Sequence, residues 1–244
     1  MPNQRLRSAL VNAGLTRAGL AERVEVDVKS VERWITQDRM PHATTRAKVA
    51  RALGSEETYF WPALLGREQT KSATNAELVQ VWPSRADVPG DVWRSLFQQT
   101  ADQVDVLVYS GGFLIEAYNL VETIRTKSAD GVNFRVLVGD PRSDAVRTRS
   151  REEGLPSLIE RTRSTLEYLA GVATLPGVQI RTHQTTLYTS QYRFDGSMLV
   201  NNHAYGSWAA NSPMLHLQRV PGGRLFAHYD AAFDRVWATG EPVA

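Results

Sequence analysis

The chain has 244 residues, of which 42% are hydrophobic and 22% are charged, and it contains no cysteine. These values are ordinary for a globular protein, and they exclude disulfide bonds and thiolate chemistry. No apolar run approaches the roughly 20 residues that cross a bilayer, and no apolar stretch follows the first residues as it does in a secretory signal. We therefore expect a cytoplasmic protein without a membrane partner.

The net charge of +2 is unevenly distributed along the chain. Residues 1–54 carry ten Arg or Lys and five Asp or Glu, so this segment has a charge of +5 and the remaining 190 residues have a charge of −3. A small basic segment joined to a slightly acidic one indicates that only the first part has a polyanionic partner.

Four short helices are predicted in the first quarter of the chain, with a tight link between the second and third that is typical of a helix-turn-helix. Leu6, Leu10 and Val11 share one face at helical spacing. Thr16 and Asp27 are suitable N-caps for the second and third helices, because their side-chain oxygens can accept from free backbone N–H groups. The residues expected to face the core of these helices are Leu20, Ala21, Val24, Val31, Trp34, Ala47, Val49, Ala50 and Leu53.

Residues Leu15 to Gly54 resemble the phage-repressor-type (XRE) helix-turn-helix family; they read LTRAGLAERVEVDVKSVERWITQDRMPHATTRAKVARALG. Glu25 stands at the turn position where this family usually has glycine, a departure with a modest backbone cost. The parts that carry the resemblance are Leu15-Thr16, Leu20-Ala21, Val26, Val31 with Arg33-Trp34, Pro41, and Ala50 to Gly54. The resemblance implies binding to double-stranded operator DNA.

It also implies that the third helix lies in the major groove. The outward side chains expected to reach base edges are Val28, Lys29, Glu32 and Arg33. Lys29 or Arg33 can donate to guanine O6 and N7, and Val28 can contact a thymine methyl group. The residues expected to hold phosphates are Arg17, Thr36 and Arg39. Lys48 and Arg51 are expected to be ordinary surface residues. Two alternatives stay open: the outward charges are merely solvated, or the helix-turn-helix serves only dimerisation.

A short aromatic helix is expected after Ser55, its N-cap. Tyr59, Phe60 and Trp61 are too apolar to be left in water, so we expect them to pack on the DNA-binding helices; a dimer seam is the alternative. The following stretch is polar and has no regular period, which is typical of a linker. The expected domains are residues 1–65, the linker 66–75, and residues 76–244.

The second domain alternates strands and helices in its first half, which indicates parallel β-α-β units, and it is richer in neighbouring strands in its second half. Strands are expected at 77–82, 104–109, 133–141, 178–185 and 215–220, with two more on either side of an Asp195-Gly196 turn. Helices are expected at 89–101, 113–131, 155–175 and 225–240. We therefore expect an α/β domain with a mixed sheet after an all-α N-terminal domain.

Ligands of such sheets bind among the loops that follow the carboxyl ends of the strands. Three loops are expected to lie there: Ser110 to Gly112, Gly139 to Ser143, and the region from Arg193 to Asp195. Gly and Ser residues that precede helix N-termini suit an anion. An anionic or phosphorylated small molecule is therefore the expected kind of ligand.

Three stretches resemble the phospholipase D superfamily: VDVLVYSGGFL, FRVLVGDPRSD and LYTSQYRFDGSMLVNN. The motif of that family is His-x-Lys followed by an Asp, a strand and an asparagine. Aligned on Asp195, the His position holds Tyr188, the Lys position holds Ser190, and Asn201 or Asn202 falls near the Asn position. The resemblance covers about the last two thirds of the chain. It implies a domain without the family's nucleophile and phosphoryl clamp.

We therefore expect no catalytic residue, no metal ion and no cofactor. None of the five histidines is followed by a lysine two residues later, and neither His183 nor His203 is accompanied by carboxylates at metal-ligand spacing. The residues expected to contact a ligand are Ser110, Asp140, Tyr188, Arg193, Asp195, Asn201 and His203.

The prediction is a sequence-specific transcription regulator rather than an enzyme, in which a non-catalytic phospholipase D-like domain dimerises and senses an anionic ligand. A homodimer is expected because one helix-turn-helix makes few base contacts. One alternative is a DNA-targeted phosphodiesterase or nuclease that uses a displaced histidine. Another is a sensor that recruits a partner protein.

Overall fold

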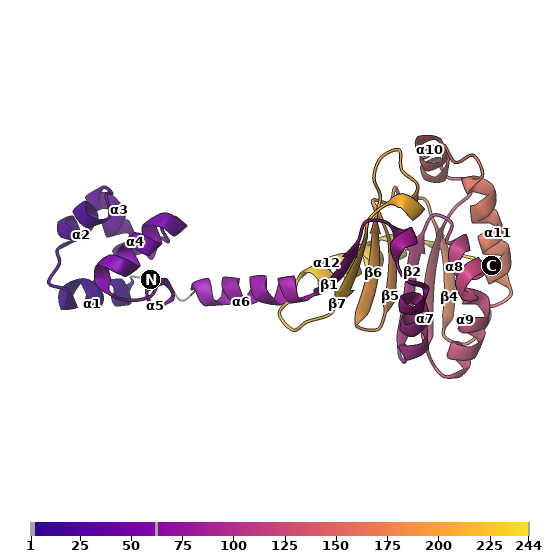
Figure 1. The fold of residues 1–244 in the computed structure, drawn as a ribbon, viewed down its shortest axis with the longest axis horizontal. Helices are drawn as coiled ribbons and strands as arrows, with labels where there is room; N and C mark the ends of the chain where they lie inside the picture. The colour runs from indigo at the N-terminus through magenta and orange to yellow at the C-terminus, as the bar shows by residue number, and fades with distance from the viewer. Residues whose placement is uncertain (1–2, 62, 244) are drawn as a thin grey trace. The chain divides into compact units, whose positions relative to one another are not determined.

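The computed structural model describes residues 3–61 and 63–243, and all of their side chains except those of residues 65 and 67–70. The chain divides into two compact units, Met1–Lys71 and Ser72–Ala244. The described residues of the first unit form helices and loops, and the second unit holds helices around one mixed sheet (Figure 1). This confirms the expected fold class, an all-α part followed by an α/β part.

The first unit begins with five short helices: α1 (Gln4–Asn12), α2 (Arg17–Arg23), α3 (Val28–Gln37), α4 (Ala43–Leu53) and α5 (Glu57–Phe60). Both predicted N-caps are present. Thr16 Oγ1 accepts from the Gly19 N–H at 3.0 Å, and Asp27 Oδ1 accepts from the Lys29 N–H at 2.9 Å. Each of these bonds satisfies an N–H that has no partner inside its helix.

The core of this unit draws apolar side chains from all of these helices. Its buried members are Leu6, Leu10, Leu20, Ala21, Val24, Val31, Trp34, Ile35, Val49, Phe60, Trp61 and Leu64. Phe60 and Trp61 therefore pack within the helical bundle as expected and are not available as a dimer seam, whereas Tyr59 is 48% exposed and its ring meets that of Phe60 only in an edge contact. Val11 and Ala47 were expected to face inward, but both are exposed, Val11 by 74%. Val11 lies about 100° around the helix from Leu10, which places it in solvent.

The segment after α4 differs from the prediction in two ways. The N-cap of α5 is Glu56 rather than Ser55, and it makes no side-chain cap bond. The expected linker, 66–75, lies inside helix α6 (Ala63–Ala76). The sequence of α6 lacks a regular apolar period but is rich in Ala, Leu, Arg, Glu, Gln and Lys, which have high intrinsic helix propensity. The polar stretch 66–75, which was expected to be a linker, is therefore helical.

The sheet of the second unit has the strand order β1-β7-β6-β5-β2-β3-β4-β8. Its strands are β1 (Leu78–Trp82), β2 (Gln103–Val108), β3 (Asn133–Gly139), β4 (Val178–His183), β5 (Thr189–Phe194), β6 (Ser197–Asn202), β7 (Met214–Gln218) and β8 (Glu241–Pro242). β2, β3 and β4 are parallel, and every other pairing is antiparallel. All of the predicted strands are present, and only the two-residue β8 was not expected.

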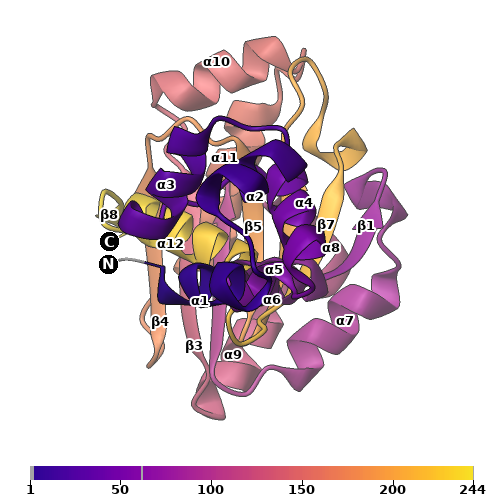
Figure 2. The ribbon, with the colours of Figure 1, turned by 90° about the vertical axis from the view of Figure 1, so that its left-hand side faces the viewer.

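Helices cover both faces of the sheet (Figures 1 and 2). They are α7 (Gly90–Gln99), α8 (Gly112–Tyr118), α9 (Leu120–Ala129), α10 (Asp144–Glu152), α11 (Leu158–Ala170) and α12 (Leu225–Trp237). The main core packs α7, α8 and α9 on one face, while Phe226 and Phe233 of α12 pack on the other. The single helix predicted at 113–131 is broken at Asn119, which has a φ of 49°, and α10 was not predicted.

Glu77 joins the first strand to the last helix. Its side chain is buried, and its two carboxylate oxygens accept from the Leu225 N–H at 2.7 Å and the Phe226 N–H at 3.2 Å. Its backbone carbonyl accepts from the Gln218 N–H at 2.8 Å. A carboxylate at a helix N-terminus also interacts favourably with the helix dipole. The beginning and the end of the second unit are therefore fastened at one residue.

Candidate functional site

Helix α3 has one buried face and one exposed face. Val31, Trp34 and Ile35 are buried against the bundle. The outward residues expected from the sequence are all exposed: Val28, Lys29, Glu32 and Arg33. Val28 and Lys29 lie in the first turn of α3, directly after the Asp27 cap, and Glu32 and Arg33 lie one turn further along. This exposed face can therefore contact another molecule without disturbing the core.

Two of the residues expected at DNA pair with each other in the free chain. Arg17 Nη1 lies 3.5 Å from Glu32 Oε1, and both side chains are about half exposed. A pair of this kind contributes only ~0–1 kcal/mol, so it separates readily when a phosphate competes for the arginine. Thr36 Oγ1 donates to the Glu32 backbone carbonyl at 2.8 Å, so its proton is used within the helix. Arg39 is exposed beyond the end of α3.

Glu25, between α2 and α3, adopts the left-handed conformation with a φ of 58°. That conformation costs a non-glycine residue roughly 1–2 kcal/mol, which explains why glycine would be favoured at this position. The carboxylate of Glu25 pairs with the ammonium of Lys48 on α4, and this interaction lowers the pKa of the Glu25 carboxyl. Lys48 was expected to be an ordinary surface residue, but it contacts this turn.

In the second unit, the carboxyl ends of β2, β3 and β4 meet at one edge of the sheet. β5 is antiparallel to β2, with Gln191 opposite Leu107 and Phe194 opposite Val104. The start of β5 therefore lies at this edge and its end lies at the opposite edge. Polar residues that the topology brings to or near this edge are Ser110, Asp140, His183, Ser190 and His203.

A cavity of about 90 Å³ opens at this edge. Polar and aromatic residues that line it are Arg85, Tyr109, Ser110, Glu153, Arg161, Ser190, Tyr192, His203 and Trp208. Tyr192 is fully buried, and its hydroxyl has no hydrogen-bond partner within the described part of the chain. Burial raises the pKa of Tyr192, against the opposing effects of Arg85 and Ser190. The hydroxyl therefore keeps its proton and can donate a hydrogen bond to a ligand.

Ser190 and His203 form a hydrogen-bonded pair in the cavity. His203 Nδ1 lies 3.2 Å from the Leu187 carbonyl oxygen, which can only accept, so Nδ1 carries the ring proton. Ser190 Oγ lies 3.0 Å from Nε2 and therefore donates to it. Burial, together with the nearby charges of Arg149 and Arg85, lowers the pKa of His203 to about 4. The imidazole is consequently neutral at pH 7.

Helix α10 holds one wall of the cavity in place. Arg149 Nη2 and Glu153 Oε1 form a buried ion pair at 2.5 Å. Trp208 Nε1 donates to the Glu153 carbonyl at 2.7 Å, and Arg149 donates to the Ser207 carbonyl at 3.2 Å. Burial raises the pKa of Glu153, while Arg149 opposes that rise. These bonds tie the 204–212 loop to α10, although the two segments are far apart in sequence.

Asp140 and His183 lie near the same edge but have structural contacts. Asp140 accepts from the Arg142 N–H at 2.9 Å and from the Gln184 amide at 3.3 Å. His183 Nε2 donates to the Val108 carbonyl at 3.0 Å, and its other ring nitrogen accepts from the Thr185 N–H at 3.3 Å. Burial lowers the pKa of His183. Both ring nitrogens are thus occupied, and neither residue lines the cavity.

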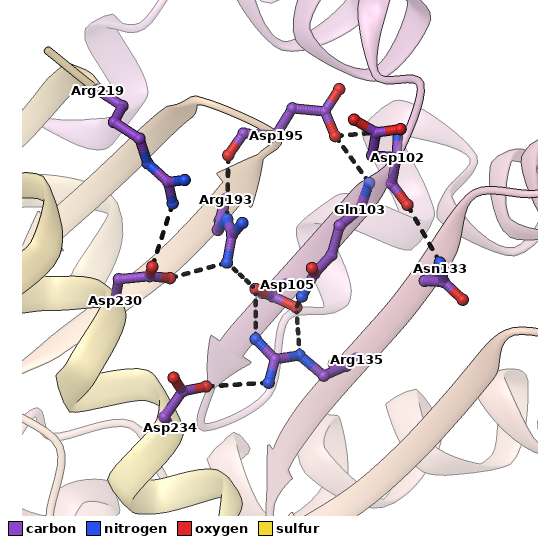
Figure 3. A network of polar contacts seen from close by, with 10 residues as sticks. All are labelled: Asp102, Gln103, Asp105, Asn133, Arg135, Arg193, Asp195, Arg219, Asp230 and Asp234. Atoms are coloured by element: carbon purple, nitrogen blue, oxygen red, sulfur yellow. Dashed lines mark hydrogen bonds and ion pairs between the residues drawn. The ribbon is translucent and has the colours of Figure 1, made fainter. Parts of the chain in front are cut away.

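Arg193 and Asp195 lie at the opposite edge of the sheet, so the expectation that they join the other two loops is wrong. The reason is the antiparallel direction of β5, which carries its C-terminal end away from the cavity. Asp195 accepts from three backbone N–H groups, those of Ala101, Asp102 and Gln103, at distances of 2.8, 3.1 and 2.7 Å. Its carboxylate therefore holds the turn after β5 (Figure 3).

Arg193 belongs to a buried ion network on the α12 side of the sheet (Figure 3). Its Nη1 lies 2.8 Å from Asp230 and 3.2 Å from Asp105. Asp105 is 1% exposed and receives two hydrogen bonds from the Arg135 guanidinium, each 2.8 Å long. Arg135 also reaches Asp234 at 2.9 Å. We call Asp105, Arg135, Arg193 and Asp230 the Asp105 network; it fastens α12 to β2, β3 and β5.

Tyr188 and Asn201 also lie outside the cavity. Tyr188 is 81% exposed and borders a separate groove of about 480 Å³ beside α12. Asn201 is opposite Ser190 in the sheet and is fully buried. Its amide donates to the carbonyls of Ser212 and Pro213 at 2.9 and 3.1 Å. Of the seven residues expected to contact a ligand, Ser110 and His203 line the cavity.

Sequence reasoning missed several residues that shape this site: Arg85, Arg161, Tyr192 and Trp208. Arg85 could have been found, because it follows the predicted strand 77–82 and strand ends converge at this edge. Tyr192 lies two residues after Ser190 in β5, and it was not selected because aromatic residues are typical of any strand. Arg161 and Trp208 carry no local signal, since only the fold brings them to the cavity.

The described residues include no cluster of three or more His, Cys, Asp or Glu side chains that could hold a metal ion. Among the described residues, none of the helices has both the length and the apolar character needed to cross a membrane.

Comparison with known proteins gives no match to any protein-family model and none to a curated protein. Among solved structures, the chain is similar to a phospholipase D family member, Nuc, from Salmonella typhimurium, with 13% identity and a TM-score of 0.44 over 67% of this chain and 96% of that one. It is also similar to TrmBL2, an archaeal chromatin protein that binds DNA, with 16% identity and a TM-score of 0.43 over 99% and 93% of the two chains. A third likeness is to phosphatidylserine synthase from Haemophilus influenzae Rd KW20, with 15% identity and a TM-score of 0.39 over 67% and 39%.

Proposed function

We propose that this chain is a sequence-specific DNA-binding transcription regulator whose second unit is a non-catalytic sensory and dimerisation domain. The observation that carries the proposal is the exposed face of α3. It presents Val28, Lys29 and Arg33 in the first two turns of the helix, after a capped N-terminus, while Val31, Trp34 and Ile35 on the opposite face are buried. This is the arrangement that a helix needs if its first turns are to reach base edges in a major groove.

The charge of the first unit supports the same proposal. Residues 1–54 carry a charge of +5, and Arg17 and Arg39 flank the exposed face of α3, where they can contact phosphates. Glu32 is held against Arg17 in the free chain. On DNA, the arginine would move to a phosphate, and Glu32 would be free to accept from a cytosine amino group. The pair thereby keeps a carboxylate from repelling the backbone before a matching sequence is reached.

The test is selection of bound sequences from a random double-stranded DNA library, followed by titration of the selected site. We expect Arg33→Ala to weaken binding to the selected site by about 1–3 kcal/mol, roughly five- to hundredfold, and to relax base preference at one position. Arg51→Ala is the matched control, because Arg51 is exposed on α4 away from that face; its effect should be small. Equal effects of the two substitutions, or no selected sequence, would contradict the proposal.

We also propose a homodimer. A single helix-turn-helix contacts few base pairs, and two copies bound to half-sites gain affinity from their linkage. The selected sequence should then be an inverted repeat with half-sites one helical turn apart, about 34–36 Å. Sedimentation equilibrium of the full chain, with and without that DNA, measures the stoichiometry. A monomer bound to a single half-site would overturn the dimer and leave the DNA-reading face standing.

One observation favours the enzymatic alternative, a phosphodiesterase or nuclease with a displaced histidine. Ser190 donates to the neutral His203, and this pairing is the one that activates a serine nucleophile. In such a step Ser190 Oγ would bond to phosphorus, the leaving oxygen would depart, and His203 would pass the serine proton to it. The low pKa of His203 opposes this role, because a base that is buried beside Arg149 and Arg85 gains a proton reluctantly.

Incubation with labelled DNA and with bis(p-nitrophenyl) phosphate, each with and without Mg²⁺ or Mn²⁺, separates the two functions. We expect no turnover. Turnover that is lost in Ser190→Ala or His203→Gln would establish the enzyme and overturn the non-catalytic proposal. His183→Ala tests the remaining histidine of this edge, whose two ring nitrogens are already bonded within the fold.

A further inference from the structure

A larger groove adjoins the cavity beside Ser190. This groove, about 340 Å³, lies between α8 and α11. It shares Arg85, Ser110 and Arg161 with the cavity, so the two spaces adjoin along these side chains. A space with a narrow end and a wide end selects a ligand with a small head and a larger body.

The narrow end requires an acceptor. Tyr192 is fully buried and its hydroxyl proton has no partner among the described residues. Arg85 and Arg161 make no ion pair with any described carboxylate, and Arg85 is held in place over the Phe113 ring, 3.9 Å from its centroid. Ser190 cannot supply a further donor, because its proton is used by His203. The unpaired donors at this end are the guanidiniums of Arg85 and Arg161 and the Tyr192 hydroxyl. The hydroxyl-bearing residues Tyr109 and Ser110 also line it, and the Glu153 carboxylate that lines it is paired with Arg149.

This set of donors suits a phosphate ester better than a carboxylate. A phosphate presents three terminal oxygens to several donors at once, and the planar fork of arginine matches two of them. A cavity of about 90 Å³ exceeds by several fold the ~10–15 Å³ that one water needs, so it has room for a group of this size. The cavity is too small for the body of an organic ligand, which must lie in the groove.

The groove is lined differently. Hydroxyl and carboxylate side chains predominate there: Glu116, Ser157, Glu160, Ser164 and Thr165. The rings of Phe113 and Tyr168 lie among them. Hydroxyls and carboxylates hydrogen-bond to the hydroxyl groups of a ligand, and aromatic faces pack on its C–H groups. A polyhydroxylated body meets both requirements, whereas a hydrocarbon body would leave the polar groups unpaired.

The geometry points to a small sugar phosphate as the ligand of this space, with its phosphate at Arg85, Arg161 and Tyr192 and its sugar between α8 and α11. This assignment rests on the sensory role proposed for the second unit and specifies the ligand. This site does not include Arg193 and Asp195, whose side chains already make hydrogen bonds and ion pairs within the fold.

Calorimetric titration of the full chain tests the assignment with four probes: glucose 6-phosphate, ribose 5-phosphate, inorganic phosphate and glucose. We expect one of the sugar phosphates to bind at least about tenfold more tightly than inorganic phosphate, since only the ester fills both ends, and glucose not to bind measurably. Inorganic phosphate that binds as tightly as both esters, glucose that binds as tightly as its phosphate, or failure of all four probes would overturn it.

Variants locate the phosphate. Arg85→Gln and Arg161→Gln should each weaken binding of the sugar phosphate about ten- to hundredfold, the usual effect of losing a hydrogen bond to a charged group. Arg125→Gln is the control, because Arg125 is exposed on α9 and, within the described part of the chain, its ion pair is with Glu122. Tyr192→Phe should weaken binding about tenfold without lowering the Tm of the free protein, because the hydroxyl that it removes has no partner there. Unchanged affinity in Arg85→Gln and Tyr192→Phe would overturn the placement.

DNA titration with and without the bound sugar phosphate then separates this inference from the proposed regulator. A ligand that binds but leaves DNA affinity unchanged contradicts the sensory role and preserves the ligand assignment. A chain that selects DNA but binds no probe contradicts the ligand assignment alone.

Discussion

Two polar clusters lie at opposite edges of the same sheet, and they differ in whether the fold satisfies them. In the Asp105 network every carboxylate faces a guanidinium, and the buried Asp105 receives bonds from two arginines. In the cavity Arg85 has no carboxylate partner among the described residues, and the Tyr192 hydroxyl has no partner at all there. Buried polar groups that have hydrogen-bond partners stabilise the fold, whereas buried polar groups without a partner are available to bind a ligand.

The largest effect on stability is expected from a substitution of Asp105. Asp105→Ala leaves Arg135 and Arg193 without their shared buried partner, and we expect it to lower the free energy of unfolding by about 3–5 kcal/mol. Urea denaturation followed by near-UV circular dichroism measures the change. Asp144→Ala is the control, because Asp144 is an exposed partner of Arg147 in a simple surface pair. A loss as small as that of the control would mean that the network does not hold α12.

In the cavity, His203 should make the stability of the protein depend on pH. Its pKa is about 4 in the folded chain, against 6.5 for a free side chain, so the unfolded chain binds the proton more readily. Stability is therefore fully present above pH 6.5 and falls as the pH drops toward 4, by about 3 kcal/mol from this group. Denaturation at pH 7 and pH 4 should show a smaller fall in His203→Gln than in the unchanged chain. Equal falls would place the imidazole in a less buried setting.

Asp195 was expected to contact a ligand, and its substitution tests whether it stabilises the fold instead. Asp195→Ala removes the acceptor of three backbone N–H groups, and we expect a loss of about 2 kcal/mol in the free energy of unfolding. Sugar phosphate affinity should stay the same, since the residue lies at the other edge of the sheet. Asp195→Asn keeps one acceptor oxygen and should lose less. A weaker ligand with unchanged stability would restore Asp195 to the site.

Tyr192 should show the smallest effect on stability. Tyr192→Phe keeps the ring contacts with Trp93 and Phe113 and removes only the unpaired hydroxyl, so we expect no loss and a gain of up to about 1 kcal/mol. The same urea experiment measures it. A clear loss of stability would reveal a partner for the hydroxyl in the free protein.

Much of the architecture could be predicted because its signals are local. Thr16 and Asp27 cap helices through side chains that lie two or three residues from the N–H groups they accept, and the strands are short apolar runs between turn residues. Val11 misled for the same reason: its spacing fits a helix, but only the position of the neighbouring helices decides which side of α1 is buried. The helical state of 66–75 required intrinsic propensity rather than period.

The site could be predicted only in part, because its members come from different strands and loops. Ser110 was found from the rule that loops at strand ends collect ligands, and His203 from an inspection of the histidines one by one. The same rule misplaced Arg193 and Asp195, since it holds for parallel strands and β5 is antiparallel to β2. Whether a polar residue is paired, as Asp195 is, or unpaired, as Tyr192 is, depends on contacts between segments about ninety positions apart or more, which no local pattern contains.

Glu77 has a consequence for how the chain is made. Its carboxylate accepts from N–H groups at the start of α12, 148 and 149 positions further along the chain. The second unit therefore cannot close until nearly all of it has left the ribosome, whereas α1 to α4 need only their near neighbours in sequence. Chains are synthesised at about 5–20 residues per second and domains fold as units from the N-terminus. Helices α1 to α4 can thus be complete for roughly ten seconds or more before the rest of the chain folds.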